Sequence, residues 1–329
     1  MIRILCVSSS IVDSCSFYRG WGPITALCNK FEGFEVKHVA EVNWAVFRQF
    51  DVVYVQRPST QSYVKIIELA KLNQKKIWID YDDNLFSVPV DNPSHGAMDK
   101  KEVKECIIQS LRMADLVTVS TEALKRVLSF HNNNVHVIPN GYDKSLFSYA
   151  ENKPHRQKTI LWRGSATHAN DLMEVTPQIV NVAKAYPDYS WAFIGEPFWY
   201  TVQEIKKVTN AVCIKTQDPI YYFKTIYDLA PTVQIAPLSD NEFNRAKSNI
   251  AWIEGTHAGA VVVAPDFPEW DMPGVNNYDH SLQYTLENVL KCQSKVNASD
   301  LDCAKRYIDE YLLLDIINKK RVELIKSIL

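Results

Sequence analysis

The sequence predicts an α/β protein made of two successive doubly wound domains. Short β-branched runs alternate with helical stretches from end to end, which is typical of parallel sheets with crossover helices. The 329 residues suffice for two domains of roughly 100–200 residues each. The polar, proline-containing segment 149–158 lacks periodicity and divides the alternation into two series. We therefore expect domains at 1–150 and 151–300, followed by C-terminal helices at 301–329 that could pack back toward the first domain.

The first series is expected to form a parallel sheet with helices between its strands. Its β-branched runs, the expected strands, lie at residues 2–8, 34–39, 51–57, 76–81, 116–120 and 135–139. Its expected helices lie at residues 22–31, 62–72, 101–113 and 121–130. Any ligand should contact loops at the carboxyl ends of the strands, because an open parallel sheet presents its functional loops there.

The second series repeats this order of strand and helix. Its expected strands lie at residues 159–162, 190–195, 212–215, 232–236 and 260–264. Its expected helices lie at residues 171–185, 201–208, 219–229 and 247–258, before a helical tail at 282–291 and 300–329. Two such domains in succession place their strand ends, and hence a ligand, in the crevice between them.

Composition excludes several classes of protein. With 36 basic and 38 acidic residues, the net charge of −2 gives no global attraction to nucleic acid or to an anionic membrane. No apolar run approaches the roughly 20 residues that span a bilayer, and the N-terminus leads into a strand pattern rather than a signal peptide. The seven cysteines lack C-x-x-C spacing, which fits reduced thiols rather than zinc ligands. We expect a cytoplasmic protein.

The most informative segment is 244–263, which places two cations and a carboxylate ahead of an apolar strand. Arg245 and Lys247 precede a predicted helix, and a helix N-terminus flanked by cations binds anions. Ser248 and Asn249 lie at the same helix start. Glu254 would face inward, where a carboxylate needs a hydrogen-bonding partner such as a sugar hydroxyl. The alternative is an ordinary amphipathic helix with a solvated basic start.

Three loops of the second domain could hold a nucleotide. The first strand ends in Arg163, Gly164 and Ser165, which together with Thr167 could cradle a phosphate. His168 follows and could instead cap the next helix. The pair Gly195 and Glu196 and the residue Pro237 end two further strands, where a nucleoside could bind or where the chain simply turns. The expected donor-binding residues are therefore Gly164, Ser165, Gly195, Glu196, Pro237, Ser248 and Asn249.

The loop after the first strand, residues 8–23, is polar and ends in aromatic residues, an arginine and glycines. Tyr18 and Trp21 offer stacking faces, Arg19 an anion contact, and Gly20 lies between them. The glycines are too sparse for the G-x-G-x-x-G fingerprint of nicotinamide or flavin binding. In the alternative interpretation, the aromatic residues plug the interface between domains.

A carboxylate cluster follows the fourth strand. Asp80, Asp82 and Asp83 could chelate a divalent metal, contact acceptor hydroxyls, or cap the following turn. His95 is the one first-half histidine in a candidate active-site loop, although a lone loop histidine usually lies at the surface. Together with the loop at 8–23, these residues form the expected acceptor-binding side.

Three blocks of the sequence resemble GT-B glycosyltransferases, specifically the large retaining group similar to glycosyltransferase family 4. The blocks are an I-P-N-G-x-D turn at 138–143, the loop 163–168, and the segment 244–263. In that group E-x7-E precedes G-x-P-V-V, and Glu254 matches the second glutamate, whereas the first falls on Ala246. The resemblance implies that Arg245, Lys247 and Arg163 clamp a diphosphate and that Glu254 orients the sugar or the ribose.

The resemblance implies transfer of a sugar from a nucleoside-diphosphate sugar, most simply a UDP-sugar, to a hydroxyl acceptor, with retention and without a metal or other cofactor. The acceptor would be a saccharide or a lipid-linked saccharide. The D-x-D-D and R-A-K-S-N variants are similar to enzymes of phages and of bacterial surface-polysaccharide clusters, so a hydroxymethylated base in DNA is an alternative acceptor. Two competing functions are a sugar-nucleotide-binding scaffold without turnover, suggested by Ala246, and a metal-dependent transferase centred on Asp80 and Asp82.

Overall fold

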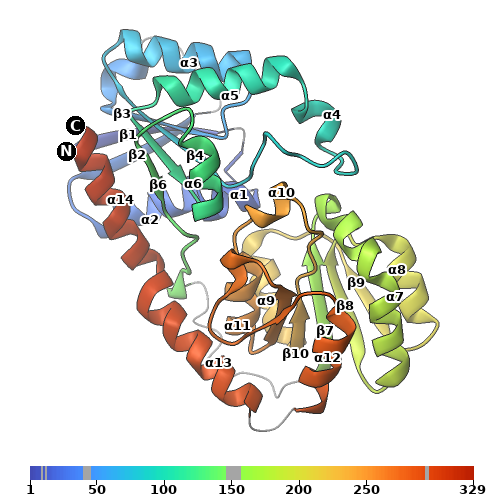
Figure 1. Ribbon diagram of the computed structural model, residues 1–329. Helices are drawn as coiled ribbons and strands as arrows, with labels where there is room; N and C mark the ends of the chain where they lie inside the picture. Colours follow the sequence, from blue (N-terminus) through green and yellow to red (C-terminus); the bar gives the residue numbers. More distant parts are fainter. Residues whose placement is uncertain (9, 12, 40–45, 146–156, 293–295) are drawn as a thin grey trace.

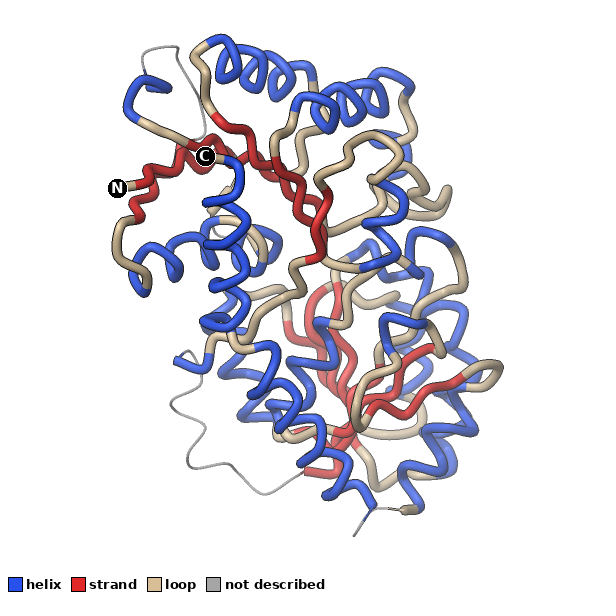
Figure 2. Tube along the Cα trace, turned by 60° about the vertical axis from the view of Figure 1, so that its left-hand side comes forward, coloured by secondary structure: helices blue, strands red, loops and turns tan. Residues whose placement is uncertain are grey.

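Two parallel sheets flanked by helices make up the computed structural model, which describes residues 1–8, 10–11, 13–39, 46–145, 157–292 and 296–329. Each domain contains one six-stranded sheet, and Figure 1 shows the first domain above the second. The view in Figure 2 shows the same separation of the two sheets from another side. The architecture is the predicted pair of doubly wound domains.

The first sheet has the order β2-β1-β3-β4-β5-β6, and every neighbouring pair is parallel. Its strands are β1 (Ile2–Val7), β2 (Phe34–Val39), β3 (Val52–Gln56), β4 (Lys76–Tyr81), β5 (Leu116–Val119) and β6 (Val135–Val137). Its helices are α1 (Ser14–Tyr18), α2 (Trp21–Lys30), α3 (Gln61–Leu72), α4 (His95–Met98), α5 (Lys101–Met113) and α6 (Glu122–Leu128), with a 3-10 turn at Val46–Gln49.

Both faces of this sheet are buried, as its β-branched strands predict. Along β1, Leu5 and Val7 pack into the core that includes residues of α3, α5 and α6. Ile4 and Cys6 alternate with them and pack on the opposite face with residues of α2 and of the C-terminal helix.

The second sheet has the order β12-β11-β10-β7-β8-β9 and is also parallel throughout. Its strands are β7 (Gln157–Gly164), β8 (Ser190–Gly195), β9 (Ala211–Ile214), β10 (Pro231–Ile235), β11 (Val261–Pro265) and β12 (Val275–Tyr278). Its helices are α7 (Ala169–Ala185), α8 (Trp199–Lys206), α9 (Pro219–Leu229), α10 (Glu242–Arg245), α11 (Ile250–Ala258) and α12 (Leu282–Lys291), with 3-10 turns at Ala166–His168 and Pro268–Trp270. The strand order reverses at β7, so the loops after β7 and β10 flank the crevice in which doubly wound sheets bind ligands.

The C-terminal tail connects the two domains. Helix α13 (Val296–Tyr307) and a π-helical turn at Ile308–Leu312 lead into α14 (Leu314–Ile328). Val322, Ile325 and Ile328 of α14 pack in the core of the first domain, and Figure 1 shows the two termini close together there. The buried side chain of Asn318 donates a hydrogen bond to the Pro23 carbonyl at 3.0 Å, which fixes α14 against α2.

Several element boundaries differ from the sequence-based expectation. The expected loop at 8–23 contains α1 and the start of α2, and β12 was not predicted. Strand β7 begins at Gln157, inside the expected linker, and residues 149–156 of that linker lie outside the described residues. Helix α11 begins at Ile250 rather than at residue 247, and residues 251–258 are all buried, so the helix has no solvated face.

Candidate active site

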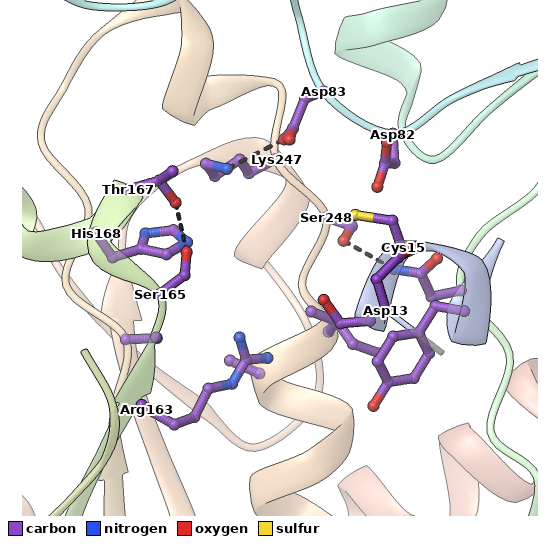
Figure 3. A pocket seen from close by; sticks show the side chains of 18 of the residues that line it. Asp13, Cys15, Asp82, Asp83, Arg163, Ser165, Thr167, His168, Lys247 and Ser248 are labelled. Atoms are coloured by element: carbon purple, nitrogen blue, oxygen red, sulfur yellow. Dashed lines mark hydrogen bonds and ion pairs between the residues drawn. The ribbon is translucent and has the colours of Figure 1, made fainter. Parts of the chain in front are cut away.

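A cavity of about 610 Å³ lies between the two domains, at the carboxyl ends of both sheets. The second domain contributes the loops after β7, β8, β9 and β10 and the start of α11. The first domain contributes α1 and the loops after β3, β4 and β6. We call these two sides the donor wall and the acceptor wall, and Figure 3 shows side chains from both.

Glu254 lies on the donor wall in the second turn of α11, and its side chain is 4% exposed. Its partners within the protein are one arginine and two tyrosine side chains. Arg163 Nη2 lies 2.6 Å from one carboxylate oxygen. The Tyr222 hydroxyl donates to that oxygen at 2.7 Å, and the Tyr18 hydroxyl donates to the other at 2.5 Å. The buried carboxylate is therefore fully engaged, as its desolvation requires.

Burial and the Glu254 carboxylate determine the protonation states of the three side chains that contact it, Arg163, Tyr18 and Tyr222. Burial raises the pKa of Tyr18 and Tyr222, and the neighbouring Glu254 carboxylate raises both further. Burial alone would lower the pKa of Arg163, but Glu254, Tyr222 and Tyr18 together outweigh that effect and raise it. The tyrosines stay protonated donors and the guanidinium stays charged across the physiological range.

Arg163 follows the buried part of β7, whose end is shaped by two glycines. Gly195 has a φ of +103°, and a Cβ there would lie 2.1 Å from the Gly164 carbonyl oxygen, so only glycine fits. Arg163 Nε has no hydrogen-bond partner within the described residues, although it is buried in the cavity wall. A buried donor without a partner is costly, which indicates a position that a ligand acceptor would satisfy.

Lys247 also faces the cavity, just before α11. Its Nζ lies 3.1 Å from Asp83 Oδ1 of the acceptor wall and 4.4 Å from the centre of the Phe243 ring. Arg57, at the end of β3 with a φ of +47°, pairs with Asp82 and with Asp83. Asp82, Arg57, Asp83 and Lys247 therefore form a row of alternating charge that runs from the acceptor wall to the donor wall.

The two carboxylates of this chain have different acidities. Burial alone would raise the pKa of Asp83, but Lys247 and Arg57 lower it below its usual value. Burial raises the pKa of Asp82, and Arg57 offsets only part of that effect. Asp83 is thus held as a carboxylate between two cations, whereas Asp82 is the more basic of the pair.

The structure removes Arg245 from the expected anion clamp. Its guanidinium pairs with Asp240, with Nη2 2.7 Å from Oδ2, and lies 4.8 Å from the centre of the Phe267 ring. The Arg245 side chain is 47% exposed and does not line the cavity. Because α10 ends at Arg245 and the chain turns at Ala246, the two cations at 245 and 247 point to different surroundings.

Ala246, at the position of the missing glutamate, is a contact between domains. It is 2% exposed and packs in a core cluster of the first domain. Its carbonyl accepts a hydrogen bond from the Thr121 hydroxyl at 2.9 Å. A glutamate here would bring a carboxylate into an apolar core, so alanine suits this site for a packing reason.

Asp80 and Arg19 form a buried ion pair beneath the acceptor wall. Arg19 Nη2 lies 2.7 Å from Asp80 Oδ2, and the two side chains are 1% and 3% exposed. Arg19 also donates to the Ile138 carbonyl at 2.5 Å, and the Thr118 hydroxyl donates to Asp80 at 2.6 Å. The Asp80 carboxylate is bound by Arg19 and Thr118 and does not line the cavity. This corrects the expectation that Asp80 holds a metal or an acceptor.

Five further predicted residues lie outside the cavity lining. On the acceptor side, Gly20 adjoins Gln56, Trp21 packs on His38, and His95 bonds through Nδ1 to the Val88 carbonyl at 2.7 Å. On the donor side, Glu196 is exposed, and Asn249 donates to the Glu269 carbonyl at 3.0 Å. The predicted residues that do line the cavity are Tyr18, Arg19, Asp82, Asp83, Arg163, Gly164, Ser165, Gly195, Pro237, Lys247, Ser248 and Glu254.

Sequence patterns indicated only some of the remaining groups that line the cavity. Tyr222 lies within α9 and had no motif to mark it, whereas Arg57 was visible as a cation at the end of a strand. His168 lies three residues before Asp171, a spacing that allows the contact of 2.9 Å found between them. The Asn140 amide, in the I-P-N-G turn, donates to the Ser248 hydroxyl at 2.9 Å and joins the two walls.

Neither a metal cluster nor a membrane span is found in the part of the chain that the structure describes. No group of three or more His, Cys, Asp or Glu side chains there could hold a metal ion. No described helix is both long and apolar enough to cross a membrane.

The likeness of this chain to known proteins rests on structure alone. No family model matches the sequence, and no curated protein matches it. A glycosyltransferase from Rickettsia africae ESF-5 is 12% identical, with a TM-score of 0.69 over 99% of this chain and 98% of that one.

Two further similar structures were solved with a nucleotide and a sugar. Anabaena HepE in complex with UDP and glucose is 13% identical, with a TM-score of 0.69 over 99% of this chain and 100% of that one. The pneumococcal O-GlcNAc transferase GtfA in complex with UDP and GlcNAc is 11% identical, with a TM-score of 0.57 over 87% of this chain and 59% of that one. At these identities the likeness shows the fold, and the chain has the GT-B fold that its sequence predicts.

Proposed function

We propose that this protein is a glycosyltransferase that moves a sugar from a UDP-sugar to a hydroxyl acceptor. One observation carries the proposal: Arg163, Lys247 and the N-terminus of α11 converge on the donor wall, where Arg163 Nε lacks a partner among the described residues. A diphosphate is the ligand that two cations and a helix N-terminus would bind together. The UDP bound to HepE and to GtfA, which share the fold, supports the choice of nucleotide.

The donor wall supplies the charge that the reaction needs. The bond from the anomeric carbon to the β-phosphate oxygen breaks, so negative charge grows on the leaving diphosphate. Arg163 and Lys247 would stabilise that charge, each by roughly 2–4 kcal/mol. Glu254 would act through Arg163, because its contact of 2.6 Å holds the guanidinium in place.

We propose retention of the anomeric configuration and a reaction that needs no metal. The new bond forms between the anomeric carbon and the acceptor oxygen on the face that the diphosphate leaves. The acceptor proton passes to the leaving phosphate, which becomes basic as it departs. The two fixed cations take the place that a metal ion would have beside the diphosphate.

A saccharide fits the acceptor wall better than DNA does. Three carboxylates line this side: Asp13, Asp82 and Asp83. Among the described residues, the cations that line it are Arg57 and Arg19. Arg57 already pairs with Asp82 and Asp83, and Arg19 pairs with Asp80. Carboxylates repel a phosphate backbone, whereas they accept hydrogen bonds from sugar hydroxyls. We therefore propose a saccharide acceptor without charge near its reacting hydroxyl.

A panel of nucleoside-diphosphate sugars tests the proposal. Each donor is incubated with the protein and with candidate oligosaccharides, and released nucleoside diphosphate and glycosylated product are measured. We expect UDP release with at least one sugar, unchanged by EDTA. Tight UDP binding without hydrolysis or transfer from any donor would instead support a binding scaffold, and loss of activity in EDTA would support a metal-dependent enzyme.

A further inference from the structure

His168 and Asp171 form a second polar unit on the donor wall. His168 precedes α7, and its Nδ1 lies 2.9 Å from Asp171 Oδ2 in the first turn of that helix. Its side chain does not cap the helix. The other carboxylate oxygen of Asp171 accepts from the Ser239 backbone N–H at 2.9 Å and from the Asn244 amide at 2.8 Å. Asp171 is thus immobilised by three donors, and it fixes the orientation of the imidazole.

This arrangement determines which ring nitrogen carries a proton. Burial alone would raise the pKa of Asp171, but His168 and Ser239 lower it below its usual value, so the side chain is an acceptor only. Nδ1 must therefore be the protonated nitrogen of a neutral ring. Nε2 is then a bare acceptor, and no partner contacts it among the residues that the structure describes.

The surroundings of Nε2 favour an anion rather than a neutral ligand. His168 lines the cavity, and Figure 3 shows its ring between Lys247 and Arg163. The charged groups that act on the ring are Asp171 from α7, Lys247 before α11, Arg163 from β7, and Asp83 across the cavity. Burial lowers the pKa of His168 and the two cations lower it further, while Asp171 opposes them. In the protein alone, these effects together keep the ring neutral near pH 7.

We propose that His168 is a third donor-binding side chain, and that it binds the diphosphate of the UDP-sugar as an imidazolium formed when the donor enters. The reason is geometric. A lone pair on Nε2 would repel the phosphate oxygens, and the proton on Nδ1 cannot move because Asp171 holds it. Nε2 can donate to a phosphate only if it takes a second proton from solvent, and the diphosphate charge beside the ring favours that uptake.

This inference rests on the proposed function, and it predicts a coupling between donor binding and pH. The pKa of His168 should rise on binding, so UDP-sugar affinity should increase as pH falls through the bound-state pKa toward the free-state pKa. A rise of one unit corresponds to about a tenfold change in affinity. UDP-glucose is the suitable probe, because its diphosphate has no group that titrates between about pH 5 and 9, whereas the terminal phosphate of UDP does.

Isothermal calorimetry with UDP-glucose, in buffers of different ionisation enthalpy, measures the protons taken up on binding. We expect the wild-type protein to take up a fraction of one proton near pH 7, and to bind about tenfold more tightly at pH 5.5 than at pH 8.5. His168→Asn keeps a donor for Asp171 but removes Nε2, and His168→Gln places a neutral amide near the Nε2 position. Both variants should lose the proton uptake, and His168→Gln should keep more of the affinity at high pH.

The exposed His280, which is 91% exposed in its side chain, provides the matched control. His280→Gln should bind UDP-glucose with wild-type proton uptake. Binding without proton uptake in the wild-type protein, or the same uptake in His168→Asn, would overturn this inference and leave the proposed function standing. No binding of any UDP-sugar to the wild-type protein would instead count against the proposed function itself.

Discussion

The two walls of the cavity use charged residues in opposite ways. On the acceptor side, Arg19 and Asp80 neutralise each other in a buried pair, and Arg57 joins Asp82 to Asp83. On the donor side, Arg163 has one carboxylate partner and a free Nε, and His168 has a free Nε2, within the part of the chain that the structure describes. Arg19 and Asp80 satisfy each other, and Asp83 also pairs with Lys247 across the cavity, whereas the donor wall keeps donors and potential donors for an anion.

This difference separates residues that hold the fold from residues that meet a ligand. A charged pair whose hydrogen bonds are all made within the protein stabilises a loop geometry. A charged group that keeps an unmade bond in a cavity indicates a ligand. Substitutions at Arg19, Arg163 and Ala246 test that distinction, beginning with the largest effect.

Arg19→Ala should reduce stability rather than activity alone. It leaves Asp80 as an unpaired carboxylate that is 3% exposed, and breaking a buried pair costs about 3–5 kcal/mol. Chemical denaturation of the whole protein measures the loss in the free energy of unfolding. Arg3→Ala is the control, because Arg3 and Asp51 are 42% and 37% exposed and such a pair contributes less than about 1 kcal/mol. Equal losses in the two variants would show that the Arg19 pair is not structural.

Arg163→Ala should affect activity much more than stability. The substitution removes a cation beside the leaving diphosphate, so kcat should fall roughly 100-fold, while Tyr18 and Tyr222 still bind Glu254. Steady-state UDP release gives kcat, and circular dichroism checks the fold. A folded Arg163→Ala variant with the wild-type kcat would remove this residue from the donor site.

Ala246→Glu restores the glutamate of the E-x7-E pattern and should not improve the enzyme. The new carboxylate would enter the core that Ala246 shares with the first domain, with a loss of about 1–3 kcal/mol from overpacking. Thermal unfolding measures this loss. Higher transfer activity in the variant would show that position 246 faces the donor sugar, contrary to its position in the structure.

Much of the fold follows from local sequence patterns. Strands β3 and β11 are apolar runs buried along their whole length, and β1 is buried from Ile4 to Val7; such runs indicate parallel strands directly. Arg163 and Lys247 were predicted as site residues because the sequence places one at the end of a strand and the other before a helix, and both line the cavity. Strand β12, Val-Asn-Asn-Tyr, was missed because an edge strand with polar residues has no apolar run.

The parts of the site that could not be predicted depend on distant partners. Arg245 and Lys247 look alike in sequence, but in the structure Arg245 pairs with Asp240 and Lys247 pairs with Asp83. Asp80 looked like part of a carboxylate cluster until Arg19, 61 residues away, was found to neutralise it. Tyr222 contacts Glu254 across 32 residues, and no local pattern records such a contact.

The affinity of Lys247→Ala and Arg245→Ala for a UDP-sugar tests the central claim most directly. These two cations lie two positions apart, but only Lys247 lines the cavity. Calorimetry with UDP-glucose should show a Kd at least about tenfold higher for Lys247→Ala, which corresponds to about 1.4 kcal/mol, and a wild-type Kd for Arg245→Ala. A wild-type Kd for Lys247→Ala together with a weakened Arg245→Ala would contradict the assignment of the donor wall.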